Sequence, residues 1–230
     1  MSPITEQQNL NRLVISYLTL RKAVGFLGIL LPIVLIVGSF LFGACTSVQD
    51  SISDYHNTNM RDVFVGILCA ISLFLFAYNG YDLEDRIAAM SAGLLGFIVA
   101  IIHDGLDEQN SCTIYPLQNI PSWFPLVHLI AAGLFFLILA YFSIFLFTKS
   151  DVLPQNQTTT KKLRNKIYRI CGYVIVICVI LLLVKFVLTF AFANLVPFLK
   201  PYKIVLILEI IMLWAFGFAW IVKGEFILQD

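Results

Sequence analysis

The chain alternates between long apolar segments and short polar connections. Six continuous apolar runs cover residues 23–43, 63–81, 87–102, 124–147, 170–193 and 204–222. Because a helix rises 1.5 Å per residue, about 20 apolar residues are enough to cross the hydrocarbon core of a bilayer. Transmembrane barrel strands alternate in polarity and are only about ten residues long. The pattern therefore predicts an all-α, polytopic bundle of six transmembrane helices, forming one domain over residues 23–230.

The first 22 residues follow a different pattern. Apolar side chains recur there at the spacing of one helix face, at Leu10, Leu13, Val14, Tyr17 and Leu18. A helix with one apolar face is suited to lie in the membrane interface. We predict a short amphipathic helix at the cytoplasmic surface over residues 1–22.

Basic residues are divided unevenly between the two sides that six spans define. One side holds Arg12, Arg21, Lys22, Arg86, Lys149, Lys161, Lys162, Arg164, Lys166, Arg169 and Lys223, and the other holds Arg61, Lys200 and Lys203. Lysine and arginine in short loops are retained in the cytoplasm. This bias predicts that both termini are cytoplasmic and that the chain is a multi-pass protein of a bacterial cytoplasmic (inner) membrane.

Composition excludes a soluble protein and argues against a nucleic-acid partner. Hydrophobic residues make up 60% of the chain and charged residues 13%, and the net charge is +1. We interpret the basic connection 149–169 as a topology determinant that contacts anionic lipid headgroups, because aromatic interleaving typical of nucleic-acid sites is missing. Membrane lipids are the predicted partners.

Imidazoles gather near the predicted outer side. Every histidine of the chain falls there: His56, His103 and His128. Asp54, Asp62 and Asp104 lie nearby in the same connections. Neutral imidazole and carboxylate are ligands that zinc accepts, which makes the three histidines candidate metal ligands. Because no two histidines share a helix face at ligand spacing, structural histidines at a wet interface are the alternative.

Two charged residues fall inside the predicted spans. Lys185 lies in the outer half of the fifth segment, and Glu209 lies about one and a half turns into the sixth. Since a lone charge inside a membrane is costly, an ion pair at comparable depth is expected. Either the pair locks the two helices together, or it lines an outward pocket with His128 for an anionic or amphipathic ligand. Asp54 and Asp62 are further candidates for that pocket.

The five cysteines separate into two groups. Cys69, Cys171 and Cys178 lie within predicted spans, where cysteine packs as a small apolar residue. Cys45 and Cys112 lie in the first and third loops on the predicted outer side, where an oxidising compartment permits a disulfide between them.

Several blocks resemble a family of bacterial six-span membrane proteins of unknown function. They are Ser51–Tyr55, Met60–Gly66, Ala140–Ser143, Phe145–Lys149, Leu213–Gly217 and Val222–Glu225. A looser resemblance, through Asp54 and the three histidines, is to the superfamily of alkaline ceramidases and progestin and adipoQ receptors. That resemblance implies zinc and hydrolysis of a membrane lipid. The superfamily has seven spans and a His-x-x-x-His pair in the last, whereas the sixth span here has no histidine.

Two catalytic sequence motifs are missing from the chain, which narrows the range of possible functions. The chain has neither a glycine-rich phosphate loop nor a Gly-x-Ser-x-Gly elbow, which argues against a nucleotide-binding protein and a classical serine hydrolase. We predict an integral membrane protein with a polar outward-facing pocket for a small or lipidic ligand. Alternatives are a metal-dependent membrane lipid hydrolase and a proton-coupled transporter that uses Glu209 and His128.

Overall fold

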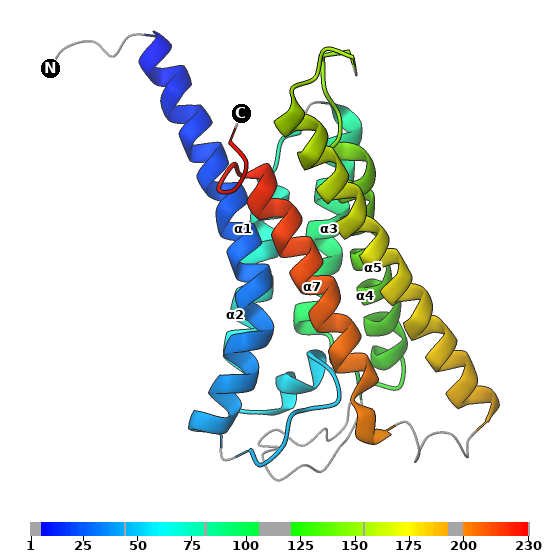
Figure 1. Ribbon diagram of the computed structural model, residues 1–230. Coiled ribbons are helices and arrows are strands. Elements are labelled where there is room, and N and C mark those ends of the chain that lie inside the picture. Colours follow the sequence, from blue (N-terminus) through cyan, green and yellow to red (C-terminus); the bar gives the residue numbers. More distant parts are fainter. Residues whose placement is uncertain are drawn as a thin grey trace, which may run out of the picture.

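The protein is all-helical over the residues that its computed structural model describes, 6–43, 45–80, 82–105, 121–153, 155–192 and 200–229, with side chains described from residue 17 onward (Figure 1). The elements are α1 (Glu6–Phe42), η1 (Ser53–Asn57), α2 (Arg61–Phe76), α3 (Leu83–Ile101), α4 (Phe124–Tyr141), η2 (Phe142–Leu146), α5 (Thr159–Ala191), η3 (Lys200–Tyr202) and α7 (Ile204–Lys223). A helix therefore lies at each of the six predicted positions.

Four of these helices are long and apolar enough to cross a membrane. They are Tyr17–Phe42 within α1, Phe124–Leu146 formed by α4 and η2, α5, and α7. The helix α2 has 16 residues, which corresponds to about 24 Å and is short of a 30 Å hydrocarbon core. The helix α3 is longer, but its first turn carries Glu84, Asp85 and Arg86.

Two helix starts differ from the prediction. The helix α1 runs without a break from Glu6 to Phe42, so residues 6–22 continue into the first apolar segment and do not form a separate helix. The helix α5 begins at Thr159, although its apolar run begins at residue 170. Thr158 caps this polar extension, because its side chain accepts a hydrogen bond from the Lys161 N–H at 3.1 Å.

The six long helices form a closed ring. In this ring, α1 packs against α2 and α7, α3 lies between α2 and α4, and α5 lies between α4 and α7 (Figure 1). The helices α1 and α7 approach each other closely at two glycines. A Cβ atom added to Gly25 would lie 2.7 Å from the Gly217 carbonyl oxygen, and one added to Gly217 would lie 2.6 Å from the Gly25 carbonyl oxygen. Small residues thus let the first and last helices close the ring.

The connections gather at two ends of the bundle, which differ in charge. One end, called the basic end, contains the start of α1, the end of α7 and residues 77–80, 147–153 and 155–158 (Figure 1). Lys149 lies there between three carboxylates, 2.9 Å from Asp82, 2.9 Å from Glu84 and 2.7 Å from the buried Asp85. The opposite end, called the His end, contains residues 45–60, 102–105 and 121–123.

Candidate functional site

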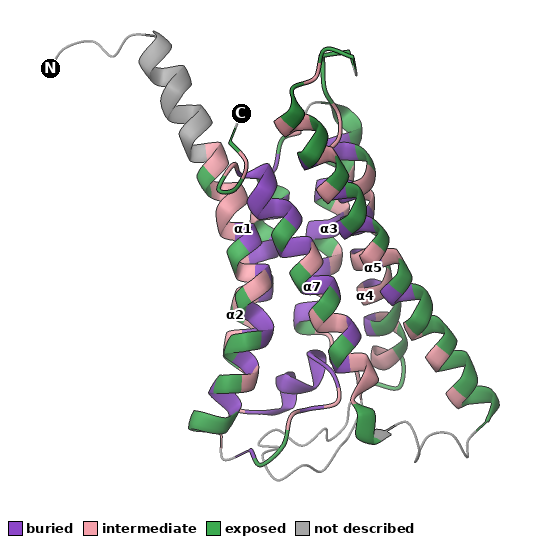
Figure 2. Ribbon diagram, viewed as in Figure 1, coloured by how far each residue is buried: buried purple, intermediate pink, exposed green. Residues whose placement is uncertain are grey.

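The connection between α1 and α2 folds back under the bundle at the His end. Every residue of η1 is buried, as Figure 2 shows. The local sequence forms this turn, because Asp54 Oδ2 accepts from the Ser51 N–H at 2.8 Å and Ser51 Oγ accepts from the Asp54 N–H at 3.1 Å. This reciprocal pair resembles the capping box of a helix start. Thr58 closes the turn by donating to the Tyr55 carbonyl at 2.8 Å.

The same connection is fastened to the last helix. The Ile52 N–H donates to Glu209 Oε2 at 2.6 Å, and the Leu206 N–H donates to the Asp50 carbonyl at 3.0 Å. Asp50 also forms an ion pair with Lys203. Glu209 therefore holds the buried loop in place from within α7.

A histidine of this loop, His56, meets His103 from the end of α3. The rings of His56 and His103 lie 3.8 Å apart between centroids, at 62° to each other, and Phe64 packs against His56 at 5.9 Å. Burial, together with the smaller effects of His103 and Arg61, lowers the pKa of His56 to about 4. Burial also lowers the pKa of His103. Both imidazoles are neutral at pH 7, which is the state that binds metal ions.

Two carboxyl groups share the layer. Burial is the main cause that raises the pKa of Asp54 to about 9, and the adjacent carboxyl of Asp104 and, to a smaller extent, Glu209 contribute to this value. Like charges at short distance cannot both ionise, so Asp54 retains a proton at neutral pH. The layer therefore carries excess negative potential that a proton or another cation relieves.

Several polar atoms of this layer are buried without a hydrogen-bond partner among the described residues. They are Asp54 Oδ1, His56 Nδ1, Asn57 Oδ1, His103 Nδ1, Asp104 Oδ1 and Asp104 Oδ2. Each can supply an electron pair, the two imidazole nitrogens in the appropriate tautomer. Buried polar groups are normally hydrogen-bonded, so this concentration of acceptors without a partner among the described residues makes the layer a candidate site for an additional group.

The other residues predicted to line the pocket, His128, Asp62 and Lys185, lie in different surroundings. His128 is buried at the start of α4, and its Nδ1 lies 2.5 Å from the Ile102 carbonyl, so it ties α4 to the end of α3. Asp62 is exposed on the first turn of α2. Lys185 is half-buried on α5, and no ion pair joins it to Glu209 in the described part of the chain. The expected lysine–glutamate pair is therefore not formed, since Glu209 accepts from Ile52 instead.

The described residues test the metal and disulfide predictions only in part. Among the residues that the structure describes, no three histidine, cysteine, aspartate or glutamate side chains are arranged to hold a metal ion. Cys45 is disulfide-bonded, whereas Cys69, Cys171 and Cys178 are free. Cys112, the predicted partner of Cys45, lies outside the described residues.

Sequence reasoning underestimated two features. Asp104 was placed near the histidines but was not included among the pocket candidates, although it lies against Asp54. The capping role of Ser51 was not predicted, although Ser51-Ile-Ser-Asp54 is a capping signature that is visible in the sequence.

The fold and the site define a class of protein: over its described residues the chain is all-helical, with four helices long and apolar enough to cross a membrane and a buried acid–imidazole layer at one end. Comparison of the chain with protein-family models, with curated proteins and with solved structures gives no match. The resemblances to the six-span family and to the alkaline ceramidase superfamily stay predictions.

Proposed function

We propose that the protein crosses a bacterial cytoplasmic membrane six times, with α2 and α3 as the shorter spans and both termini in the cytoplasm. Three observations support this topology. The helices α2 and α3 pack in the same ring as the four longer helices. Most basic side chains belong to one end of that ring. The disulfide-bonded Cys45 lies at the other end, and disulfides persist mainly outside the cytoplasm.

Cysteine labelling tests this topology. Asp62→Cys at the His end and Asn156→Cys at the basic end replace exposed residues, and the cysteines that are free among the described residues all lie within helices. A membrane-impermeant maleimide is expected to label Asp62→Cys in intact cells and Asn156→Cys only after the membrane is opened. The reverse pattern would contradict the orientation, and labelling of both positions in intact cells would contradict the number of spans.

For the site, we propose that the His end binds a cation from the outer side, and that a borderline divalent metal ion such as zinc suits it best. The observation that supports this proposal is the set of buried electron-pair donors in this layer that lack a hydrogen-bond partner among the described residues, above all His56 Nδ1 and His103 Nδ1. The carboxyl groups of Asp54 and Asp104 lie beside them and share a proton. Leaving one such group unsatisfied costs about 1–3 kcal/mol, and a single cation satisfies several at once. An anionic ligand is disfavoured, because Asp54, Asp104 and Glu209 share the layer and Lys185 does not pair with any of them.

The donors suit zinc in kind. His56, His103, Asp54 and Asp104 are the side chains that would hold the ion, which would act there as a Lewis acid. Water would complete its coordination, since no three of these ligands are in place together in the described chain. We therefore expect weaker binding than at a closed structural zinc site. None of these contacts favours hydrolysis or proton-coupled transport over binding, so both stay alternatives.

Thermal unfolding of the detergent-purified protein after chelation tests the proposal. Zinc added at about 100 times its dissociation constant is expected to stabilise the wild type by about 2.7 kcal/mol. His103→Gln and Asp54→Asn are expected to lose most of this shift. The control is Asp62→Asn, which removes an exposed carboxylate from the same end and should respond like the wild type.

Two outcomes would overturn the cation site. One is the absence of any shift with zinc, manganese, magnesium or calcium in the wild type. The other is an equal zinc shift in wild type, His103→Gln and Asp54→Asn, because the ion would then bind elsewhere on the protein.

A further inference from the structure

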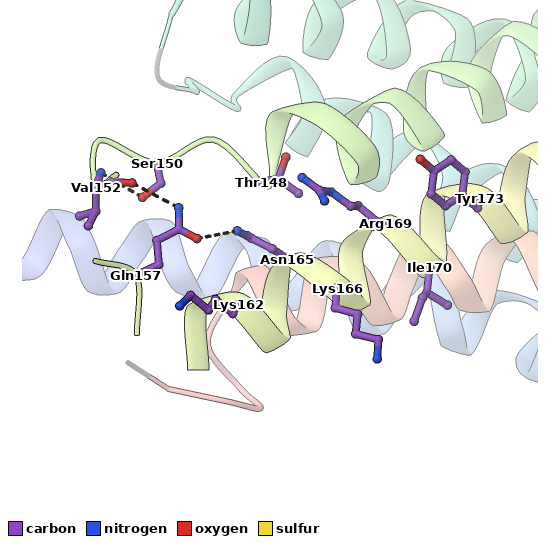
Figure 3. A pocket seen from close by; sticks show the side chains of 10 residues that line it. All are labelled: Thr148, Ser150, Val152, Gln157, Lys162, Asn165, Lys166, Arg169, Ile170 and Tyr173. Atoms are coloured by element: carbon purple, nitrogen blue, oxygen red, sulfur yellow. Dashed lines mark hydrogen bonds between the residues drawn. The ribbon is translucent and has the colours of Figure 1, made fainter. Parts of the chain in front are cut away.

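A cleft at the basic end lies between α5 and the connection that follows η2, with a volume of about 610 Å³ (Figure 3). One wall is a single face of α5, because its members follow helical spacing: Lys162, Asn165, Lys166, Arg169, Ile170 and Tyr173. The other wall consists of Thr148, Ser150, Val152 and Gln157. This cleft is at the opposite end of the molecule from the proposed cation site.

The cleft is strongly basic. Three of its ten lining residues are cationic and none is acidic. Lys162, Lys166 and Arg169 are exposed, and none of the three forms an ion pair within the described residues. Arg169 reaches across the cleft toward Thr148 (Figure 3). Such a site attracts an anion, and a guanidinium beside a hydroxyl is suited to a phosphate group.

Amide side chains fix the base of the cleft and leave one acceptor open. Gln157 Nε2 donates to the Val152 carbonyl at 3.2 Å, and Asn165 Nδ2 donates to Gln157 Oε1 at 3.3 Å. The remaining oxygen, Asn165 Oδ1, is buried without a partner among the described residues. A ligand that offers both a phosphate and a hydroxyl would satisfy the cations and this oxygen together.

Below the cations, the same face of α5 turns apolar and stays exposed. Its exposed side chains continue at helical spacing through Ile170, Tyr173, Ile177, Ile180 and Val184 (Figure 2). Tyrosine is enriched where membrane headgroups meet hydrocarbon. A phosphate site that continues into an apolar stripe matches a phospholipid, whose headgroup and acyl chains present the same order. A free phosphate ion would contact only the basic part of the cleft and not the apolar stripe.

We propose that this cleft binds the headgroup of an anionic glycerophospholipid that carries a hydroxyl, with phosphatidylglycerol as the representative. Lys162, Lys166 and Arg169 contact the phosphate, Asn165 accepts from the headgroup hydroxyl, and the acyl chains lie along the α5 stripe. The basic loop thus holds a specific lipid in addition to setting the topology.

Native mass spectrometry and thermal unfolding in lipid nanodiscs test this assignment. Every one to two cations are expected to contribute about a tenfold gain in affinity for an anionic lipid. With three cations, the wild type is therefore expected to bind phosphatidylglycerol on the order of 100-fold more strongly than phosphatidylcholine. The variant Lys162→Gln/Lys166→Gln/Arg169→Gln is expected to lose this preference. It should still fold and insert, because its changes are on exposed side chains and Lys149, Lys161 and Arg164 stay in place.

A matched pair of single variants separates the cleft from general electrostatics. Arg169→Gln removes a cation from the cleft, and Arg86→Gln removes an exposed cation from α3 at the same end. A weaker preference for phosphatidylglycerol in Arg169→Gln, with Arg86→Gln unchanged, supports the proposal. Equal effects of both variants, or an unchanged preference in the triple variant, would overturn it. The proposal would also be overturned if a soluble anion occupied the cleft. In that case inorganic phosphate or glycerol phosphate would stabilise the protein in phosphatidylcholine nanodiscs as much as phosphatidylglycerol does.

Discussion

Gly217→Ala is expected to destabilise the helix bundle by about 1–3 kcal/mol, the usual cost of overpacking a tight contact. The added Cβ would lie 2.6 Å from the Gly25 carbonyl oxygen and 2.7 Å from Ile29 Cγ1. The nearest obstacle is backbone, so α1 and α7 must separate to admit it. Alanine favours a helix over glycine by about 1 kcal/mol, and the clash at this contact outweighs that gain.

The control for this variant is Gly133→Ala on α4. An added Cβ at Gly133 meets no heavy atom within 4 Å, so only the helix-propensity gain operates there. We expect Gly133→Ala to be as stable as the wild type or slightly more stable in thermal unfolding of the purified protein. If Gly217→Ala unfolds at the same temperature as Gly133→Ala, the first and last helices do not approach as closely as described.

The apolar pattern was sufficient to predict where the helices lie, because burial in lipid requires apolar side chains and satisfied backbone groups. It was less informative about their ends. Polar turns such as Thr159–Arg169 contain no apolar run, yet a capping threonine and good helix formers extend α5 through them. The order of helices around the ring depends on contacts such as Gly25 with Gly217, which no periodicity encodes.

The site was predictable in composition and less so in geometry. The loop between α1 and α2 and the ends of two other helices contain the residue types of an acid–imidazole layer. The contact between His56 and His103 depends on how two separate connections fold together, which the sequence does not specify. The expected pairing of Lys185 with Glu209 relied on equal depth alone. Depth does not determine which way a helix face points, and Glu209 is oriented toward the η1 loop.

The proton on Asp54 predicts a characteristic dependence of stability on pH. The pKa of this carboxyl is about 9 in the folded protein, raised by burial and by Asp104, against 3.8 as its ordinary value. Between these values the folded state holds a proton that the unfolded state has released. Stability is therefore fully present below pH 3.8 and is lost as the pH rises toward 9, by up to about 1.4 kcal/mol per pH unit.

His56 acts in the opposite direction in a lower range. Its pKa is lowered to about 4 by burial, so its contribution is present above the ordinary value of 6.5 and is lost as the pH falls toward 4. Below pH 6.5 the two groups change the stability in opposite directions. Above pH 7 the contribution of His56 is constant, so the loss of stability due to Asp54 can be measured by itself. His103, Arg61 and Glu209 face the same layer and are common to the wild type and the variant compared next.

Asp54→Asn is expected to remove the loss of stability between pH 7 and pH 9, because asparagine has the shape of the protonated acid and cannot ionise. Thermal unfolding with a chelator present measures this, and the stability difference between variant and wild type should widen in favour of the variant as the pH rises. Asp62→Asn, at an exposed carboxylate, should follow the wild-type profile throughout. Parallel profiles for wild type and Asp54→Asn over this range would mean that Asp54 is already ionised at neutral pH. The negative potential that attracts a cation would then have to come from an ionised pair, and zinc uptake would no longer release a proton.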